Sequence, residues 1–336
     1  MRRGIALATV VAVALGIVLG LAGCGGDREA LTIYSGRTES LVGPLLERFS
    51  EENDIAIDVR YGDTNDLALL IGTEGDRSPA DVFWSQSPGA TAYLAGRGLL
   101  APLPARTLSM VAQGFEGGDG EWVGVSARER TLVYNQDEVV ESDLPGSIFD
   151  LTAPRYRGRV AVAPSNGSFQ DFITAMRVIE GEAATGRWLR AMVANDVRAY
   201  ANNSAIVEAV GRGEVDMGLV NHYYNYRFLE EDPGLPTRNH QFADGDIGNL
   251  VIPSSVSVLA SSGRQGDARR FVDFLLGEGA QRYFADETFE YPLTAGVAPA
   301  PGVPPLDTLR PPTGERADEL GDIEATGRLI AGSGLN

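Results

Sequence analysis

Short apolar runs alternate with amphipathic segments along most of the chain, a pattern typical of an α/β fold. Residues 31–34 have the apolar character of a strand, and residues 41–49 repeat apolar side chains at helical spacing. The same order of strand and helix returns in residues 55–74 and in residues 81–96. Three successive units of this kind predict a parallel sheet covered by helices.

A second series of strand-like and helical segments runs from about residue 159 to about residue 230. Two further pairs of strand-like segments predict the places where the chain crosses between two lobes: 123–127 with 131–134, and 247–252 with 256–259. The expected fold is therefore two α/β lobes joined by hinge crossings, with a ligand cleft between them where strand ends meet helix starts. Closure of such a hinge around a solute would provide the signal that a transporter reads.

The boundaries of the two lobes follow from these crossings. The N-terminal lobe is expected to contain residues 31–127 and about 255–300, and the C-terminal lobe about 128–254 and 301–336. Residues 298–312 hold six of the 18 prolines, which predicts an extended loop before a final helix near residues 317–330.

The N-terminus is typical of a processed export signal. Two arginines precede an uncharged apolar run that ends in Leu-Ala-Gly before Cys24, the only cysteine. Residues 1–23 are thus predicted to be a lipoprotein signal peptide, Cys24 the site of lipid attachment, and residues 24–30 a polar tether. The alternative is a cleaved secretory signal with an incidental cysteine. Either way the globular part lies outside the cytoplasm, and the first interpretation anchors it by lipid to the periplasmic or cell-surface face of the membrane.

Charge and composition narrow the classes of ligand. The chain carries 28 arginines, no lysine and 46 acidic residues, with a net charge of −18. Such an acidic protein is a poor partner for nucleic acid. One cysteine and two histidines exclude a disulfide framework, a cysteine-rich zinc site and a histidine cluster, so that oxygen atoms would have to hold any metal.

Motifs for catalysis are missing from the sequence. It contains no Gly-x-Ser-x-Gly elbow, no phosphate-binding loop and no His-Glu-x-x-His helix. We therefore predict a binding protein and not an enzyme. An exported hydrolase or lyase on a similar framework is the alternative, and it lacks a recognisable nucleophile and base. An ordinary structural or surface role is favoured for both His222 and His240.

A tyrosine cluster directly follows the apolar run 217–220, where the end of a strand would place it at the rim of the cleft. Tyr223 and Tyr224 are adjacent at a predicted helix start, and Tyr226 follows closely. Phenols with an ordinary pKa of about 10 lose their protons near neutral pH only to a strongly Lewis-acidic cation, and Fe(III) is the biological ion that fits. The alternative is that these tyrosines serve only as packing residues.

Several ordered motifs resemble those of the bacterial ferric-ion-binding proteins, the solute-binding components of iron(III) ABC importers. The similarity runs from Leu31 to about Asn336, and the motifs that carry it are 33–37, 78–83, 132–135, 200–210, 221–224 and 290–293. The resemblance implies a type II periplasmic-binding-protein-like fold, a monomer, and delivery of a ferric ion or ferric chelate to an ABC transporter permease.

The resemblance also implies a set of iron ligands. The tandem tyrosines correspond to Tyr223 and Tyr224, and a third phenolate used by some members is matched to Tyr134. Members that use a histidine have Thr38 in its place here, and a glutamate of other members aligns with Gln86. The incomplete set could be filled by Glu39 or by a synergistic anion such as carbonate.

The expected anion contacts come from two places. Arg37 has the planar fork that suits carbonate. A second group matches the anion pocket of phosphate-using relatives and consists of Asn166, Gly167, Ser168, Asn203 and Asn221. Each of these has an alternative role as a helix cap or turn residue. The same scaffold could also bind an organic or phosphorus-containing anion, or a polyamine, with the tyrosines stacking on it.

Overall fold

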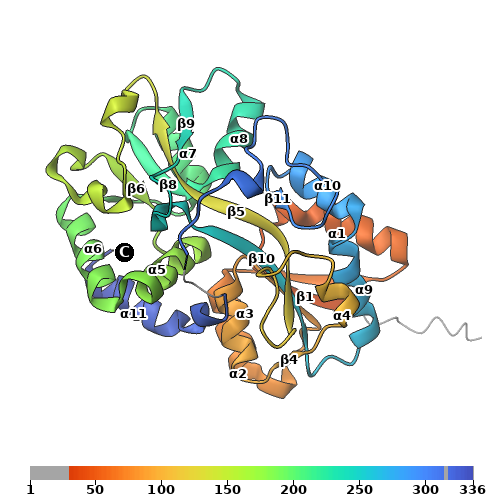
Figure 1. Ribbon diagram of the computed structural model, residues 1–336. Helices are drawn as coiled ribbons and strands as arrows, with labels where there is room; N and C mark the ends of the chain where they lie inside the picture. The colour runs from red at the N-terminus through yellow and green to blue at the C-terminus, as the bar shows by residue number, and fades with distance from the viewer. Residues whose placement is uncertain (1–29, 314–316, 336) are drawn as a thin grey trace, which may run out of the picture.

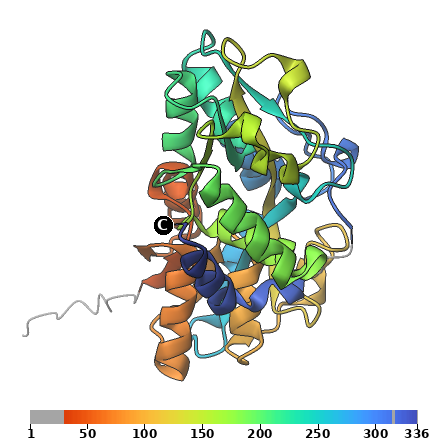
Figure 2. The ribbon, with the colours of Figure 1, turned by 90° about the vertical axis from the view of Figure 1, so that its left-hand side faces the viewer.

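The computed structural model describes residues 30–313 and 317–335, so the predicted signal peptide and Cys24 lie outside the described residues. Two half-sheets with helices on their faces form two lobes that share one long central strand (Figures 1 and 2). In the N-terminal half, the three predicted strand–helix units are present. They are β1 (Leu31–Ser35), α1 (Glu39–Asn53), β2 (Ile57–Tyr61), α2 (Thr64–Glu74), β3 (Val82–Ser85) and α3 (Pro88–Ala95).

These first three strands are parallel, in the order β2-β1-β3, as the repeated strand–helix pattern predicts. The whole sheet is mixed, because β10 (Val251–Leu259) lies antiparallel beside β3. The apolar stripe of α1 faces the sheet, and Leu41, Leu45 and Phe49 are all buried there. Helices α9 (Gln265–Leu275) and α10 (Glu278–Asp286), which the sequence analysis did not identify, complete this core.

The first predicted crossing is one continuous strand. The predicted segments 123–127 and 131–134 belong to one strand, β5 (Trp122–Asn135), which is buried along its whole length. Its first half pairs with β10, and its second half pairs with β8 (Met217–Asn221). Of the other predicted pair, Ile247–Asn249 is a 3-10 turn and β10 begins only at Val251, so the expected strand over 247–252 is mostly wrong. Because β5 belongs to both half-sheets, it is the hinge.

The C-terminal half is built around β8 and also contains short strands and long helices. Its elements are β6 (Val160–Val162), α5 (Gly167–Glu180), α6 (Glu182–Ala194), β7 (Arg198–Ala199), α7 (Asn203–Gly211), α8 (His222–Glu231) and β9 (Thr237–His240). Elsewhere in the described chain, the remaining strands and α-helices are β4 (Leu100–Ala101), α4 (Ala105–Leu108), β11 (Tyr291–Pro292) and α11 (Ile323–Ser333). The final predicted helix is thus a 3-10 turn over Ala317–Gly321 followed by α11.

The lobes touch one another along α5. The side chain of Asn65, on α2, donates a hydrogen bond to Gln170 on α5. A Cβ atom added at Gly167 would lie 3.3 Å from Cβ of Thr64, so the N-termini of α2 and α5 are in close contact across the cleft. Helix α11 packs on α5 and α6 and also on α3, which leaves the assignment of residues 301–336 to the C-terminal lobe a prediction.

None of the helices formed by residues 30–313 and 317–335 is long and apolar enough to cross a membrane.

Candidate metal centre

The tyrosine pair lies at a strand-to-helix junction, as the sequence predicts. Strand β8 ends at Asn221 and α8 begins at His222, which places Tyr223 and Tyr224 in the first helical turn. Their rings stack with centroids 4.3 Å apart and planes inclined by 28°. Tyr223 is only 1% exposed and packs against the core of the N-terminal lobe, whereas Tyr224 is half-buried.

Both phenol oxygens of this pair are free of hydrogen bonds to residues 30–313 and 317–335. Across the part of the chain that the structure describes, neither hydroxyl forms a hydrogen bond. Burial raises the pKa of Tyr223 well above its ordinary value, and Tyr224 raises it further, while Arg37 and Arg128 act in the opposite direction. Burial thus favours the protonated form of Tyr223, and only a strongly Lewis-acidic ligand would remove that proton near neutral pH.

Arg37 is bound to a carboxylate of the protein, and its predicted contact with an anion stays a prediction. Its two terminal nitrogens donate to Oε1 and Oε2 of Glu290 at 2.8 and 2.7 Å, and both side chains are fully buried. Only Nε of Arg37 is without a partner among the described residues. The motif that supplied Glu290 was recognised in the sequence, but nothing in its spacing showed that it would face a residue 253 positions earlier.

Two other arginines near the tyrosine pair have nitrogen atoms that donate no hydrogen bond to a described residue. Arg128 and Arg130 project from the same face of β5 because side chains alternate along a strand. Both are fully buried: Arg128 donates to the carbonyl of Ile252 at 3.3 Å, and Arg130 donates to Oδ1 of Asn221 at 3.0 Å. Nε and Nη2 of Arg128 and Nη2 of Arg130 find no partner within the described residues. Burial, followed by the charge of Arg128, lowers the pKa of Arg130 to about 9.

The predicted anion-contacting residues are brought together, and most bind one another. Oδ1 of Asn166 accepts hydrogen bonds from the backbone and hydroxyl of Ser168, which makes Asn166 the N-cap of α5. Nδ2 of Asn221 donates to the Ser168 hydroxyl at 3.2 Å, and Nδ2 of Asn203 donates to Asn166 at 3.4 Å. Gly167 lies beside them. The network links α5, α7 and β8 to Arg130, and the buried Oδ1 of Asn203 stays unpaired within the described parts of the chain.

The two carboxylate positions discussed from the sequence differ in their location. Glu39 is exposed on the first turn of α1, and its carboxylate forms no hydrogen bond or ion pair with a described residue. Gln86 is buried in the cleft. Its backbone N–H donates to Oγ1 of Thr64 at 3.1 Å, and its Oε1 lies 3.9 Å from the Cβ position of Gly167. Metal ligation by Glu39 therefore stays a prediction.

Tyr134 lies further along β5 than the part of the strand that pairs with the end of β8, and its expected role as a third ligand stays a prediction. It pairs with Met217 on β8, four residues before Asn221, and four strand residues span about 13 Å. Its ring packs in the core of the C-terminal lobe and lines a separate cavity. Because side chains alternate along a strand, Tyr134 lies on the same face of β5 as Arg128 and Arg130, but four residues beyond Arg130.

His222 has the structural role that was favoured for it. Its Nδ1 accepts the backbone N–H of Glu129 at 3.1 Å, and its Nε2 is 2.9 Å from the carbonyl of Phe289, so both ring nitrogens are occupied. Its ring stacks on Tyr291 with centroids 4.6 Å apart. Burial lowers its pKa to about 4. His222 thus fixes the start of α8 against β5 and β11.

Asp171 is a buried group of the site that sequence reasoning missed. It lies on the apolar face of α5, and burial raises its pKa to about 7 against the opposing effects of Ser87 and Arg128. The signal that could have found these residues was charge on an apolar surface: an aspartate within the buried stripe of α5, and Arg-Glu-Arg at 128–130 in a strand without other charges. No group of three or more His, Cys, Asp or Glu side chains that could hold a metal occurs in the described chain.

Glu129, between the two arginines, points to the other face of β5. It is 3% exposed, and both its oxygens accept from Nε2 of Gln241 at 3.0 Å. Burial raises its pKa from about 4.5 to about 7.

The raised carboxyl pKa of Glu129 makes the folded protein less stable as the pH rises from about 4.5 to about 7, because the folded state then holds a proton that the unfolded state has lost. At pH 8 we therefore expect Glu129→Gln to melt at a higher temperature than the wild type, with an unfolding free energy larger by on the order of 3 kcal/mol. At pH 4.5 the two proteins should melt at about the same temperature. Thermal melts at both pH values check this, and an equal difference at both would contradict it.

With the geometry established, comparisons with known proteins define the family. The sequence profile of the family described as bacterial extracellular solute-binding protein matches residues 77–319. The Fe(3+)-binding periplasmic protein of Serratia marcescens is 34% identical over 289 residues, which cover 84% of this chain and 85% of the relative. The major ferric iron-binding protein of Neisseria meningitidis serogroup B is 32% identical over 309 residues, covering 91% and 93%. The chain belongs to the bacterial extracellular solute-binding protein family.

Solved structures agree with this assignment. Iron-bound HitA from Pseudomonas aeruginosa is 35% identical with a TM-score of 0.86, covering 91% of this chain and 99% of that one. A Trichodesmium protein in complex with iron and citrate ligands is 25% identical with a TM-score of 0.76, covering 91% and 100%. These matches confirm the predicted resemblance to the bacterial ferric-ion-binding proteins and the predicted type II periplasmic-binding-protein-like fold.

Proposed function

We propose that the protein binds Fe(III) outside the cytoplasm through the phenolate oxygens of Tyr223 and Tyr224 and delivers it to the permease of an ABC importer, without catalysing a reaction. The observation that carries this proposal is the stacked pair of tyrosines in the interlobe cleft whose hydroxyls bind no described residue. Relatives named for ferric iron binding, at 32–34% identity over most of the chain, support it. We retain the predicted lipid anchor on Cys24 and the monomeric state as parts of this proposal.

The charges of the site favour an anion bound together with the metal. The Arg37–Glu290 pair is neutral, whereas Arg128 and Arg130 are buried with free donors. Two phenolates cancel only part of the charge of Fe(III). Carbonate, or the carboxylates of a chelate such as citrate, would supply further oxygen ligands and would pair with the arginines. A neighbour with iron and citrate is consistent with either source.

Release of the metal depends on the same tyrosines and arginines that bind it. Because burial raises the pKa of Tyr223, protonation competes strongly with the metal. Opening of the hinge would separate α2 from α5 and let water reach the phenolates and the arginines. The permease would therefore need only to favour the open arrangement of the lobes to free the ion.

A visible absorption titration tests the proposal. The mature protein without Cys24 is stripped of metal and titrated with a weak ferric chelate, in buffers with bicarbonate, with citrate, or with neither. We expect a tyrosinate-to-Fe(III) charge-transfer band that grows to one equivalent and requires one of the two anions. In Arg130→Gln the band should form more weakly, because the variant loses a donor to the anion. Absence of the band under every condition would leave an organic or phosphorus-containing anion, held by Arg128 and Arg130, as the ligand to pursue.

A further inference from the structure

A second pocket lies behind the hinge, on the face of β5 to which Glu129 points. We call it the rear pocket. It encloses about 490 Å³, a volume within the range of small-molecule sites. Its principal lining residues come from β5, α8, β9 and β11, and are Glu129, Tyr134, His222, Tyr226, His240 and Tyr291. The tyrosine pair of the cleft contributes no side chain to it.

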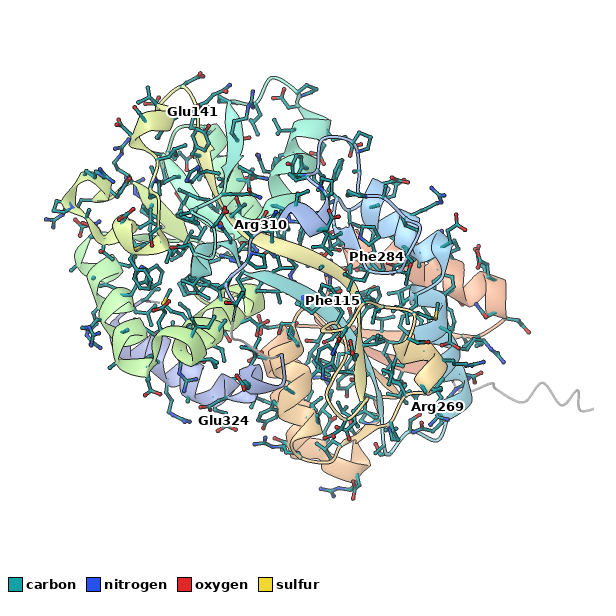
Figure 3. The ribbon with its side chains drawn as sticks, viewed as in Figure 1. Phe115, Glu141, Arg269, Phe284, Arg310 and Glu324 are labelled. Carbon is teal, nitrogen blue, oxygen red and sulfur yellow. The ribbon has the colours of Figure 1, made fainter. Side chains whose placement is uncertain are left out.

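The rear pocket has a carboxyl group at its base, which carries a negative charge above its pKa of about 7. The carboxylate of Glu129 is almost fully buried, and its only side-chain partner in the described structure is the neutral amide of Gln241. No ion pair is formed by Glu129 within residues 30–313 and 317–335. A second carboxylate, Glu141, lines the pocket from the exposed loop after β5, at the outer edge of the C-terminal lobe (Figure 3). The lining residues include no arginine, and the one histidine that contacts the backbone of Glu129, His222, has a pKa lowered to about 4.

Aromatic rings form the walls around this charge. Tyr134, Tyr226 and Tyr291 line the pocket together with the two histidine rings. Tyr291 is fully buried, yet its hydroxyl has no hydrogen-bond partner in the described structure. Buried polar groups are nearly always paired, so this hydroxyl has the capacity to form one hydrogen bond with a molecule that reaches it. Rings next to a buried carboxylate are the arrangement that binds organic cations, through the ring faces and the charge.

From this geometry we propose that the rear pocket is a second binding site, for a small organic ammonium ion. Its nitrogen would lie against Glu129, with Tyr291 as an additional acceptor, and its carbon atoms would contact Tyr134 and Tyr226. The site is independent of metal binding in the cleft, since the pair Tyr223 and Tyr224 takes no part in it. The charge of the Glu129 carboxylate favours a cation over a neutral polyol of the same size.

Calorimetric titration of the metal-free mature protein at pH 8, where Glu129 is ionised, tests this. Choline and putrescine are the probes, and their neutral isosteres, 3,3-dimethylbutan-1-ol and 1,4-butanediol, are the matched controls. We expect at least one cation to bind at one site per chain, with its isostere at least about tenfold weaker. Glu129→Gln should weaken the cation by at least about tenfold, because it removes the charge and keeps the shape. The double variant Tyr223→Phe/Tyr224→Phe should bind the cation as the wild type does.

Three results would overturn the proposal: no binding of either cation, equal binding of the neutral isosteres, or unchanged binding in Glu129→Gln. Loss of cation binding in the double tyrosine variant would place the site in the cleft and would overturn it as well. The isostere comparison uses only wild-type protein, so it decides even if Glu129→Gln does not fold. Tyr291→Phe gives a second variant, and we expect a smaller loss from it because one neutral acceptor is removed.

Discussion

Replacing Tyr223 and Tyr224 by phenylalanine is expected to abolish tight ferric binding while the fold is retained. Phenylalanine preserves the stacked rings and their packing against the N-terminal lobe, and removes only two oxygen atoms. Loss of a single group that merely orients a metal ligand already costs about 10–100-fold in affinity. We therefore expect the loss of two ligands to exceed about a thousandfold, and the charge-transfer band to disappear.

The measurement is a competition titration against a ferric chelator, with circular dichroism and a thermal melt to verify folding. Tyr134→Phe is the matched control, because it removes one phenol oxygen from a buried tyrosine about 13 Å along β8 from the end that carries the pair. Its affinity and its spectrum should equal those of the wild type if Tyr223 and Tyr224 are the only tyrosine ligands. If Tyr134→Phe loses iron while the double variant retains it, the assignment of the ligands to Tyr223 and Tyr224 is wrong; if both variants lose iron, Tyr134 is a third ligand, as the sequence predicts.

The pattern of apolar positions was sufficient to predict most of the N-terminal half of the fold. Each of its first three strand–helix units has a clear period and a short connection, which single-sequence patterns report well. The same reasoning divided β5 at Arg128–Arg130, since three charged residues interrupt an apolar run. Strand pairing on both edges and burial of these charges at the lobe interface decide that the strand continues, and neither is a local property of the sequence.

For the site, local order was predictable and long-range partnership was not. The sequence placed Tyr223 and Tyr224 at a strand end because β8 and α8 are adjacent along the chain. It could not show that Arg37 would be occupied by Glu290, which depends on the packing of segments that are 253 residues apart. The outcome changes the chemistry, because the free donors for an anion belong to Arg128 and Arg130 instead.

The pairing of Arg37 with Glu290 also leads to the largest expected effect on stability. Glu290→Gln leaves the guanidinium of Arg37 buried with only one neutral acceptor, and removing one member of a buried ion pair costs about 3–5 kcal/mol. We expect the melting temperature to fall by roughly 5–10 °C. The hydroxyl of Thr288, which donates to the carboxylate at 3.1 Å, would lose a charged partner as well. Urea unfolding and thermal melts measure both quantities.

A matched control is available on the surface. Glu278 forms an ion pair with Arg282 four residues later at 2.8 Å, but the glutamate side chain is 70% exposed and the arginine 59%. Exposed pairs of this kind contribute only about 0.3–0.5 kcal/mol, so Glu278→Gln should leave the melting temperature nearly unchanged. Arg37→Met with Glu290→Leu removes both charges, and we expect it to be more stable than Glu290→Gln alone, because no unpaired ion is then left in the interior. A double variant that melts below Glu290→Gln would contradict this. The ion pair itself would then stabilise the fold, and the cost of a lone buried charge would not explain the effect of Glu290→Gln.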